Sequence, residues 1–221
     1  MAVLQWDQTG SRYYENGVQK CVLYPMSSAS YPVGVAWNGI TAINESPDGA
    51  DTTDLWADNI KYGTMRAAET FGGTIEAYTY PNEWEPCDGS ASPVSGVAVG
   101  QQTRQAFGLC YRTEIGSDAS TAAGYKLHVV YGATASPSER NHETINDSPD
   151  ATAMSWEFDT IPAAFLATGS YSTLKPTAHI VFDSITLGSS KMTALESVLY
   201  GTSTSSAYLP LPDDLLAIVA S

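Results

Sequence analysis

The sequence has few positive charges and few cysteines, and it contains no long apolar run. Only 10 lysines and arginines stand against 24 aspartates and glutamates, which gives a formal net charge of −14. Such a charge repels polyanions, so we do not expect a nucleic-acid binder that gains its affinity by neutralising phosphates. The charge does not exclude a protein that lets DNA pass without gripping it.

The cysteines and the hydropathy exclude further classes. Cys21, Cys87 and Cys110 are odd in number, widely spaced and without a C-x-x-C pair, so we expect reduced structural thiols instead of a disulfide framework or a zinc site. No window approaches the roughly 18 to 20 apolar residues of a membrane helix. The start, MAVLQWDQTG, has no basic region followed by an apolar run, so we expect a soluble protein that is not exported.

Apolar residues alternate with polar ones along much of the chain, which is typical of half-buried antiparallel strands. One further strand, in GTIEAYTYP, ends at Pro81, because proline cannot donate to a strand ladder. The clearest apolar rows are Tyr125, Leu127, Val129 and Tyr131; Phe107, Leu109 and Tyr111; Met154, Trp156 and Phe158; and Ala178, Ile180 and Phe182.

One helix is predicted near residues 190–200, where KMTALESVLYG places apolar residues along one stripe and ends in Gly201. Whether NEWEPCDGS forms a short helix is left open by the sequence. The length favours one domain, 1–221, with an N-terminal arm (1–34), a β-rich core (35–201) and a C-terminal extension (202–221). The apolar end of that extension, LLAIVA, either docks on a neighbouring molecule or folds back on its own subunit.

Two short segments resemble one another. INESPDGA at 43–50 and INDSPDAT at 145–152 are each followed by a tryptophan, Trp56 and Trp156. The simpler interpretation is a pair of Ser-Pro-Asp turns, in which proline fixes φ and the acidic side chain bonds back to the backbone. The alternative is a duplicated half of the fold.

No group of residues in the sequence predicts catalysis. Ser138, Glu139, His142 and Asp147 lie close together, but they follow turn-forming residues and lack the G-x-S-x-G elbow of a serine nucleophile. The segment 131–147 is better explained as a polar connection. With 24 acids in the chain, pairs such as Glu157 and Asp159, or Glu83 and Glu85, arise easily without a role in glycoside hydrolysis.

Metal and cofactor sites are not predicted either. The spacing of Asp48, Asp51 and Asp54 misses the alternate-residue pattern of a calcium loop. His128, His142 and His179 stand apart in the sequence, and the glycines of ETFGGTIEAY indicate a turn or bulge instead of a phosphate loop. We therefore expect no enzyme, no cofactor and no metal, but a protein that acts through its surfaces.

Several long runs are similar to the major tail protein, or tail tube protein, of long-tailed bacteriophages. They occur in the order that this family shows and cover about residues 34–183. The runs are GVAWNGITAINESPDGA, DNIKYGTMRAAETFGGTIEAYTYPNEW, CDGS, GQQTRQAFGLCYRTEIG, YKLHVVYGATASPSERNHETINDSP and KPTAHIVFDS.

The resemblance implies a mainly β subunit, a tail-tube-type β-sandwich or barrel with one flanking helix and extended loops or arms. Such subunits assemble into rings, usually hexameric, that stack into a tube in the virion tail after synthesis in the host cytoplasm. DNA passes through the channel without specific binding. The other partners implied are the tail terminator, the tape measure and the tail tip.

Two physical features agree with that implication. Joining sheets between subunits removes exposed strand edges, and a negative wall keeps phosphates from sticking. Candidates for wall residues are Glu114, Glu157, Asp159 and Asp183. Two other functions stay open: a carbohydrate-binding β-sandwich that uses exposed aromatics such as Trp84 and Tyr78, and an acidic glycosidase that uses Glu157 or Asp159.

Overall fold

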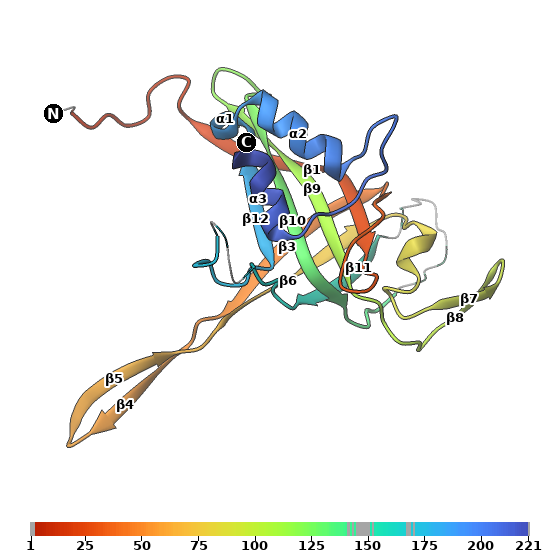
Figure 1. Ribbon diagram of the computed structural model, residues 1–221, viewed down its shortest axis with the longest axis horizontal. Helices are drawn as coiled ribbons and strands as arrows, with labels where there is room; N and C mark the ends of the chain where they lie inside the picture. Colours follow the sequence, from red (N-terminus) through yellow and green to blue (C-terminus); the bar gives the residue numbers. More distant parts are fainter. Residues whose placement is uncertain are drawn as a thin grey trace.

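The computed structural model describes residues 3–140, 142, 144, 151, 153–166, 169 and 171–220. The protein is mainly β, with a large antiparallel sheet of eight strands and a few short helices toward the C-terminus (Figure 1). Within the described ranges, no helix is long and apolar enough to cross a membrane. The mainly β prediction is confirmed.

The large sheet has the strand order β2-β1-β9-β10-β11-β6-β3, with β12 also paired to β10. Two separate hairpins are formed by β4 (Thr52–Ala57) with β5 (Ile60–Arg66) and by β7 (Ala91–Val94) with β8 (Val97–Val99). The strands of the large sheet are β1 (Tyr13–Pro25), β2 (Val35–Ala36), β3 (Ile40–Gly49), β6 (Glu69–Ala77), β9 (Phe107–Ser117), β10 (Gly124–Ala135), β11 (Met154–Thr160) and β12 (His179–Asp183).

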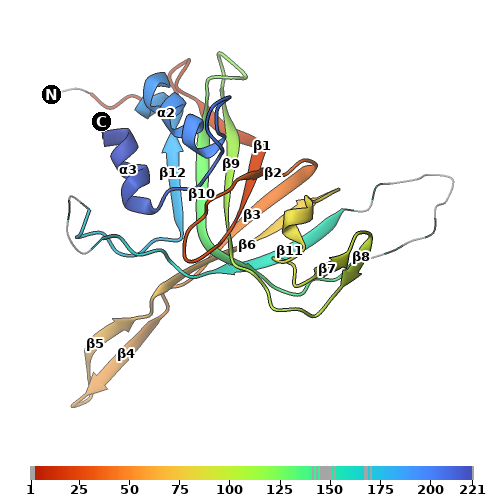
Figure 2. The ribbon, with the colours of Figure 1, turned by 45° about the vertical axis from the view of Figure 1, so that its right-hand side comes forward.

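Strand β10 belongs to both halves of the sheet. Its first part pairs with β12, from Lys126 to Val130, and its last three residues, from Ala133, pair with β11. The register shift between Val130 and Ala133 contains Gly132, whose φ of +61° favours glycine. Because such a bulge bends a strand, β11, β6 and β3 run across β1, β9 and β12 (Figure 2).

Each face of the central strands carries its own core. The inner core lies inside the bend, where side chains such as Leu109, Val130 and Trp156 meet. The helix-side core lies on the opposite face of β1, β9, β10 and β12 and includes Cys110 and Val129. It is covered by α2 (Ser189–Leu199) and α3 (Pro212–Ala220) (Figure 1). Two shorter helical segments are α1 (Ser184–Leu187) and η1 (Asn82–Trp84).

The strand faces predicted from alternation are confirmed. Leu127, Val129 and Tyr131 point into the helix-side core, whereas Trp156 and Phe158 point into the inner core. The predicted helix is α2, which ends at Leu199. Its Met192, Leu195 and Leu199 are buried. The NEWEPCDGS segment forms only the single turn η1.

The two flanks differ from the prediction in part. The sequence predicts an arm over residues 1–34, but β1 is an inner strand of the sheet, paired with β9 over most of its length, so among the described residues of this flank the segment 3–12 extends away from it. The C-terminal extension folds back on its own subunit. Leu209 and Leu215 are buried in the helix-side core, which explains where its apolar residues go.

The first Ser-Pro-Asp segment lies within strand β3, so its interpretation as a turn is wrong. Pro47 faces Phe71 of β6, and β3 is the outermost strand of its half of the sheet. An edge strand tolerates proline because one side of its backbone needs no ladder partner. The second segment, 145–152, lies outside the described residues except for residue 151, so the duplication is not tested.

Candidate functional site

The hairpin of β4 and β5 projects far from the rest of the subunit, continuing the direction of β3 and β6 (Figures 1 and 2). Its turn consists of Asp58 and Asn59, with φ values of +50° and +63°. Two successive residues with positive φ are typical of the type I′ turn, whose twist matches that of a two-stranded ribbon. The hairpin is therefore a defined element and not an irregular loop.

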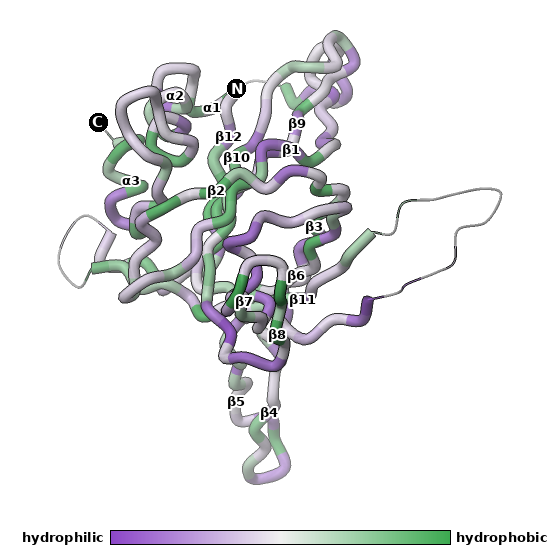
Figure 3. Tube along the Cα trace, turned by 90° about the vertical axis from the view of Figure 1, so that its right-hand side faces the viewer, coloured by the Kyte–Doolittle hydropathy of each residue, from purple (hydrophilic) through white to green (hydrophobic). Residues whose placement is uncertain are grey.

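The hairpin exposes large apolar side chains that no other described part of this subunit covers. Trp56 is 68% exposed, Ile60 63%, Tyr62 76% and Met65 61%. An isolated two-stranded hairpin is marginally stable in water, and an exposed group of this kind marks an interaction surface. Hydrophobic and polar stretches alternate along it (Figure 3). We take this hairpin as the candidate assembly element.

Two further segments expose apolar residues away from the cores. The arm of residues 3–12 exposes Val3, Leu4 and Trp6, and its end is held where the Gly10 amide donates to the Asp118 carboxylate (2.9 Å). The short hairpin of β7 and β8 is hydrophobic (Figure 3). Its exposed valines are Val94, Val97 and Val99.

Several edges of the large sheet remain open among the described strands. Strand β3 pairs only with β6, and β12 pairs only with β10. Along β1, β2 pairs with Val22 and Leu23 and the Trp37 amide donates to the Cys21 carbonyl, so the described edge from Tyr13 to Lys20 has no ladder partner on that side. Open edges are templates for pairing with another chain.

The four acids proposed for a channel wall lie in three different settings. Glu114 accepts a hydrogen bond from Gln19 (2.6 Å) and lies 3.7 Å from the Arg112 guanidinium. Glu157 and Asp159 are exposed on β11 and line one groove. Asp183 caps α1, because its carboxylate accepts from the amides of residues 185 and 186. The assignment of these four acids to a channel wall stays a prediction.

The segment 131–147 contains no described catalytic constellation. Residues 131–135 are the end of β10, and the Ser138 hydroxyl donates weakly to the Ser136 carbonyl (3.4 Å). His142 is exposed, and Asp147 lies outside the described residues. The alternative of carbohydrate binding treated Trp84 as an exposed aromatic, which is wrong, because this side chain is fully buried between Trp37 and Trp156 in the inner core. Tyr78 is exposed.

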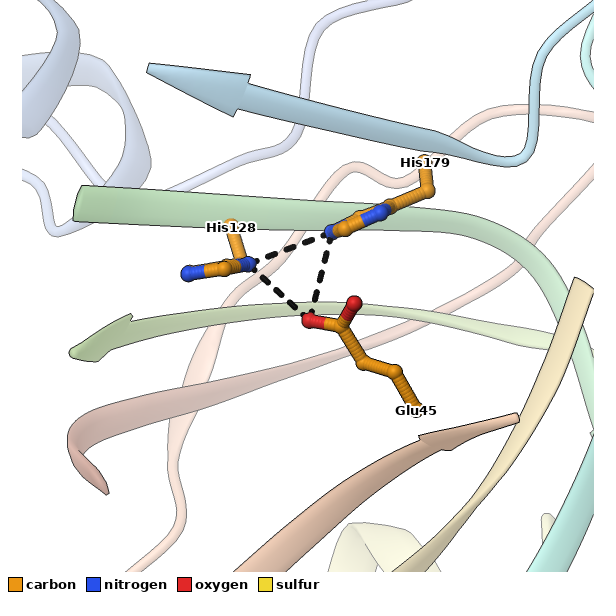
Figure 4. Close-up of side chains that lie close together, drawn as sticks. All are labelled: Glu45, His128 and His179. Carbon is orange, nitrogen blue, oxygen red and sulfur yellow. Dashed lines mark hydrogen bonds and ion pairs between the residues drawn. The ribbon is translucent and has the colours of Figure 1, made fainter. Parts of the chain in front are cut away.

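Three ionisable side chains meet where the inner core gives way to a polar groove (Figure 4). Glu45 comes from β3, His128 from β10 and His179 from β12. His128 Nδ1 lies 3.1 Å from Glu45 Oε1 and 3.3 Å from His179 Nε2. The distance from His179 Nε2 to Glu45 Oε1 is 3.7 Å.

Aromatic rings and hydroxyl groups hold this cluster in place. His128 stacks on Tyr111, and His179 stacks on Phe71. The Tyr111 hydroxyl donates to Glu45 Oε1 (2.5 Å). On its other side, His128 Nε2 lies 3.0 Å from the Thr113 hydroxyl.

The cluster favours a charged carboxylate. The pKa of Glu45 is lowered to about 2, chiefly by its hydrogen bond with His128, and the Tyr111 hydroxyl and His179 act in the same direction against the effect of burial. Burial lowers the pKa of His179 below its ordinary value, and burial raises that of Tyr111. A carboxylate and two imidazoles that converge in this way can bind a proton or a metal ion.

The sequence reasoning missed this cluster. It treated the histidines as standing apart in the sequence, whereas His128 is buried beside His179. The antiparallel register puts Val130 opposite His179, so His128 lies only two residues along β10 from the partner of His179. Recognition of the pairing between β10 and β12 would have predicted that the two histidines lie close together. Glu45 arrives from the other half of the bent sheet, which no local pattern indicates.

Comparison of the chain with protein-family models and with curated proteins finds no match.

Proposed function

We propose that this protein is a structural subunit that assembles with copies of itself into the tube of a phage tail, through which DNA passes. The observation that carries the proposal is the β4–β5 hairpin, whose exposed Trp56, Ile60 and Tyr62 need a partner outside the subunit. A second copy of the chain is the partner that the sequence resemblance implies. In that arrangement the hairpin reaches across to a neighbouring subunit.

Two other features support self-assembly. The open edges of β1, β3 and β12 offer backbone donors and acceptors that identical copies can pair. The formal net charge of −14 suits a channel through which a polyanion slides, because the wall would not hold phosphates. The finer description, a tail-tube β-sandwich or barrel in stacked and usually hexameric rings, is part of this proposal. So are the terminator, tape measure and tail tip as partners.

Electron microscopy of the purified protein, without an affinity tag, tests the proposal. We expect rings or hollow filaments in negative stain, and a rising sedimentation coefficient as the protein concentration increases. The double variant W56S/Y62S removes two exposed apolar side chains from the hairpin and is expected to stay as small species. A uniform wild-type monomer at high concentration would contradict the proposal.

A matched pair of tyrosines controls for the loss of exposed surface in general. Tyr62 on the hairpin is 76% exposed, and Tyr78 beyond the end of β6 is 54% exposed. Y62S is expected to reduce filament length or number, whereas Y78S is expected to assemble like the wild type. Equal behaviour of the two variants would remove the hairpin from the assembly interface. Circular dichroism spectra establish that both variants are folded.

A further inference from the structure

We propose that Glu45, His128 and His179 bind one divalent transition-metal ion of the zinc class. The three side chains offer a carboxylate oxygen and two imidazole nitrogens, all within 4.8 Å of one another (Figure 4). Imidazole and carboxylate are common ligands of zinc in proteins. The proposal goes beyond assembly, because it concerns the isolated subunit and does not depend on tube formation.

The spacing of the donor atoms fits an ion. Four ligands at about 2.0–2.1 Å from zinc, arranged as a tetrahedron, lie about 3.3–3.4 Å from one another. The separations between the three donor atoms here are 3.1, 3.3 and 3.7 Å, which bracket that value. An ion therefore fits with only small movements of the side chains.

A chain of hydrogen bonds orients His128 for metal binding. The Thr113 hydroxyl donates its proton to Glu15 Oε1 (2.5 Å), so toward His128 Nε2, 3.0 Å away, its oxygen can only accept. When an ion replaces the Nδ1 proton that hydrogen-bonds to Glu45, the remaining proton of a neutral His128 is on Nε2, where the Thr113 oxygen accepts it. This leaves the lone pair of Nδ1 directed at His179 and Glu45, the arrangement that a metal ligand requires.

The charged group at the far end of this chain is itself held in place. Lys126 forms an ion pair with Glu15. Burial raises the pKa of Glu15, but the hydrogen bonds with Lys126 and Thr113 together lower it more, so the pKa lies below its ordinary value. On the opposite side of the site, Tyr111 donates to the Glu45 oxygen. Outer partners that hydrogen-bond to the ligands are characteristic of metal sites, where they fix ring orientation and tautomer.

The site is open to solvent on one side. His128 is buried, His179 is partly buried, and the side chain of Glu45 is 34% exposed. All three line a groove that also includes Asn44 and Lys126. An ion can therefore enter from solvent, and a water molecule is the natural fourth ligand because the protein supplies three.

The ion would join strands that the sheet itself does not pair. His128 and His179 belong to the neighbouring strands β10 and β12, whereas Glu45 lies on β3, the last strand of the sheet order, separated from β10 by β11 and β6. Strand β3 leads directly into the projecting hairpin, which begins at Thr52. Metal binding would thus fix the base of that hairpin against the body of the subunit.

Zinc titration of the full chain without a histidine tag tests the proposal. We expect one Zn²⁺ per chain by isothermal titration calorimetry, and an intense visible absorption on addition of Co²⁺, as for four-coordinate sites. E45Q and H179N each remove one ligand and are expected to weaken zinc binding at least as much as the loss of an outer partner does, which is about 10- to 100-fold. T113V leaves all three ligands in place and removes the orienting hydroxyl, and it is expected to weaken binding by about 10- to 100-fold.

Matched controls use a histidine and a glutamate outside the groove. H142A and E69Q alter exposed residues and are expected to bind zinc like the wild type. Melting curves establish that each variant is folded, and E45Q keeps the shape of the side chain at a partly exposed position. The absence of a saturable site for Zn²⁺, or equal affinity of E45Q, H179N and the wild type, would overturn the proposal in favour of a hydrogen-bonded cluster without metal.

Discussion

Gly132 of β10 and Ile161, just beyond β11, are in direct backbone contact. The Ile161 amide donates to the Gly132 carbonyl (3.0 Å), and the Ile161 carbonyl oxygen lies 2.1 Å from where a Cβ of residue 132 would be. This contact is located at the bulge where the sheet bends and its second half begins. The bend depends on a residue without a side chain.

The variant G132A is expected to lose at least about 2 kcal/mol of unfolding free energy, because a left-handed φ costs a non-glycine residue about 1–2 kcal/mol and the backbone clash adds to this. Urea unfolding measures the loss. Gly63 on the hairpin has open space around it, so G63A should change stability by less than about 0.5 kcal/mol. Equal stability of G132A and the wild type would show that the bend tolerates a side chain.

Asp183 is expected to act as a helix cap. Its carboxylate accepts from the amides of Ile185 (2.8 Å) and Thr186 (3.3 Å), so D183A should lose about 1 kcal/mol of stability. Asp159 is exposed on β11, and D159A should change stability by no more than about 0.5 kcal/mol. Thermal unfolding compares the two. A stability of D183A equal to that of D159A would speak against the cap.

The three cysteines should be unreactive in the native protein. All are free and buried, and burial raises the pKa of Cys21 and of Cys87 to about 12. At pH 8 such a thiol is ionised about 10³-fold less than a free thiol with a pKa of about 8.5. We expect slow reaction with a disulfide reagent until urea unfolds the chain, and then three equivalents. Rapid labelling of the folded protein would contradict this expectation.

The C-terminal helix should contribute to the stability of the single subunit. Leu215 is fully buried in the helix-side core, so L215A should lose about 2–5 kcal/mol. Leu211 is 44% exposed, and L211A should lose much less. Urea unfolding at low protein concentration measures both variants without assembly. If L215A unfolds like the wild type, α3 does not pack on its own subunit in solution.

Local patterns predicted the strand faces well. Alternation places Leu109 on one face of β9 and Cys110 on the other, as observed, but β9 is buried on both faces and not half-buried as predicted, because helices α2 and α3 cover the second face. This works because side chains of a strand alternate regardless of its partners. The stripe of helix α2 was predicted for the same reason, from a spacing that is local.

Contacts between distant segments were not predictable from one sequence. The pairing of β10 with β12 brings His128 and His179 together across 51 positions, and the bend at Gly132 then brings in Glu45. Trp84 was considered for sugar binding as an exposed aromatic, but the turn after Pro81 places it in the inner core. Whether Leu215 packs on its own subunit depended on the space in the helix-side core, which the sequence does not reveal.

Consecutive residues of β9 and β10 fill different cores, so these two strands form a partition with packed side chains on both surfaces. Because both cores pack on the same backbone, disruption of one core also exposes the other core to solvent. The subunit is therefore expected to melt in one cooperative transition, and the amide hydrogens of this partition should be the last to exchange with solvent. The projecting ribbon of β4 and β5, which shares neither core, should exchange first.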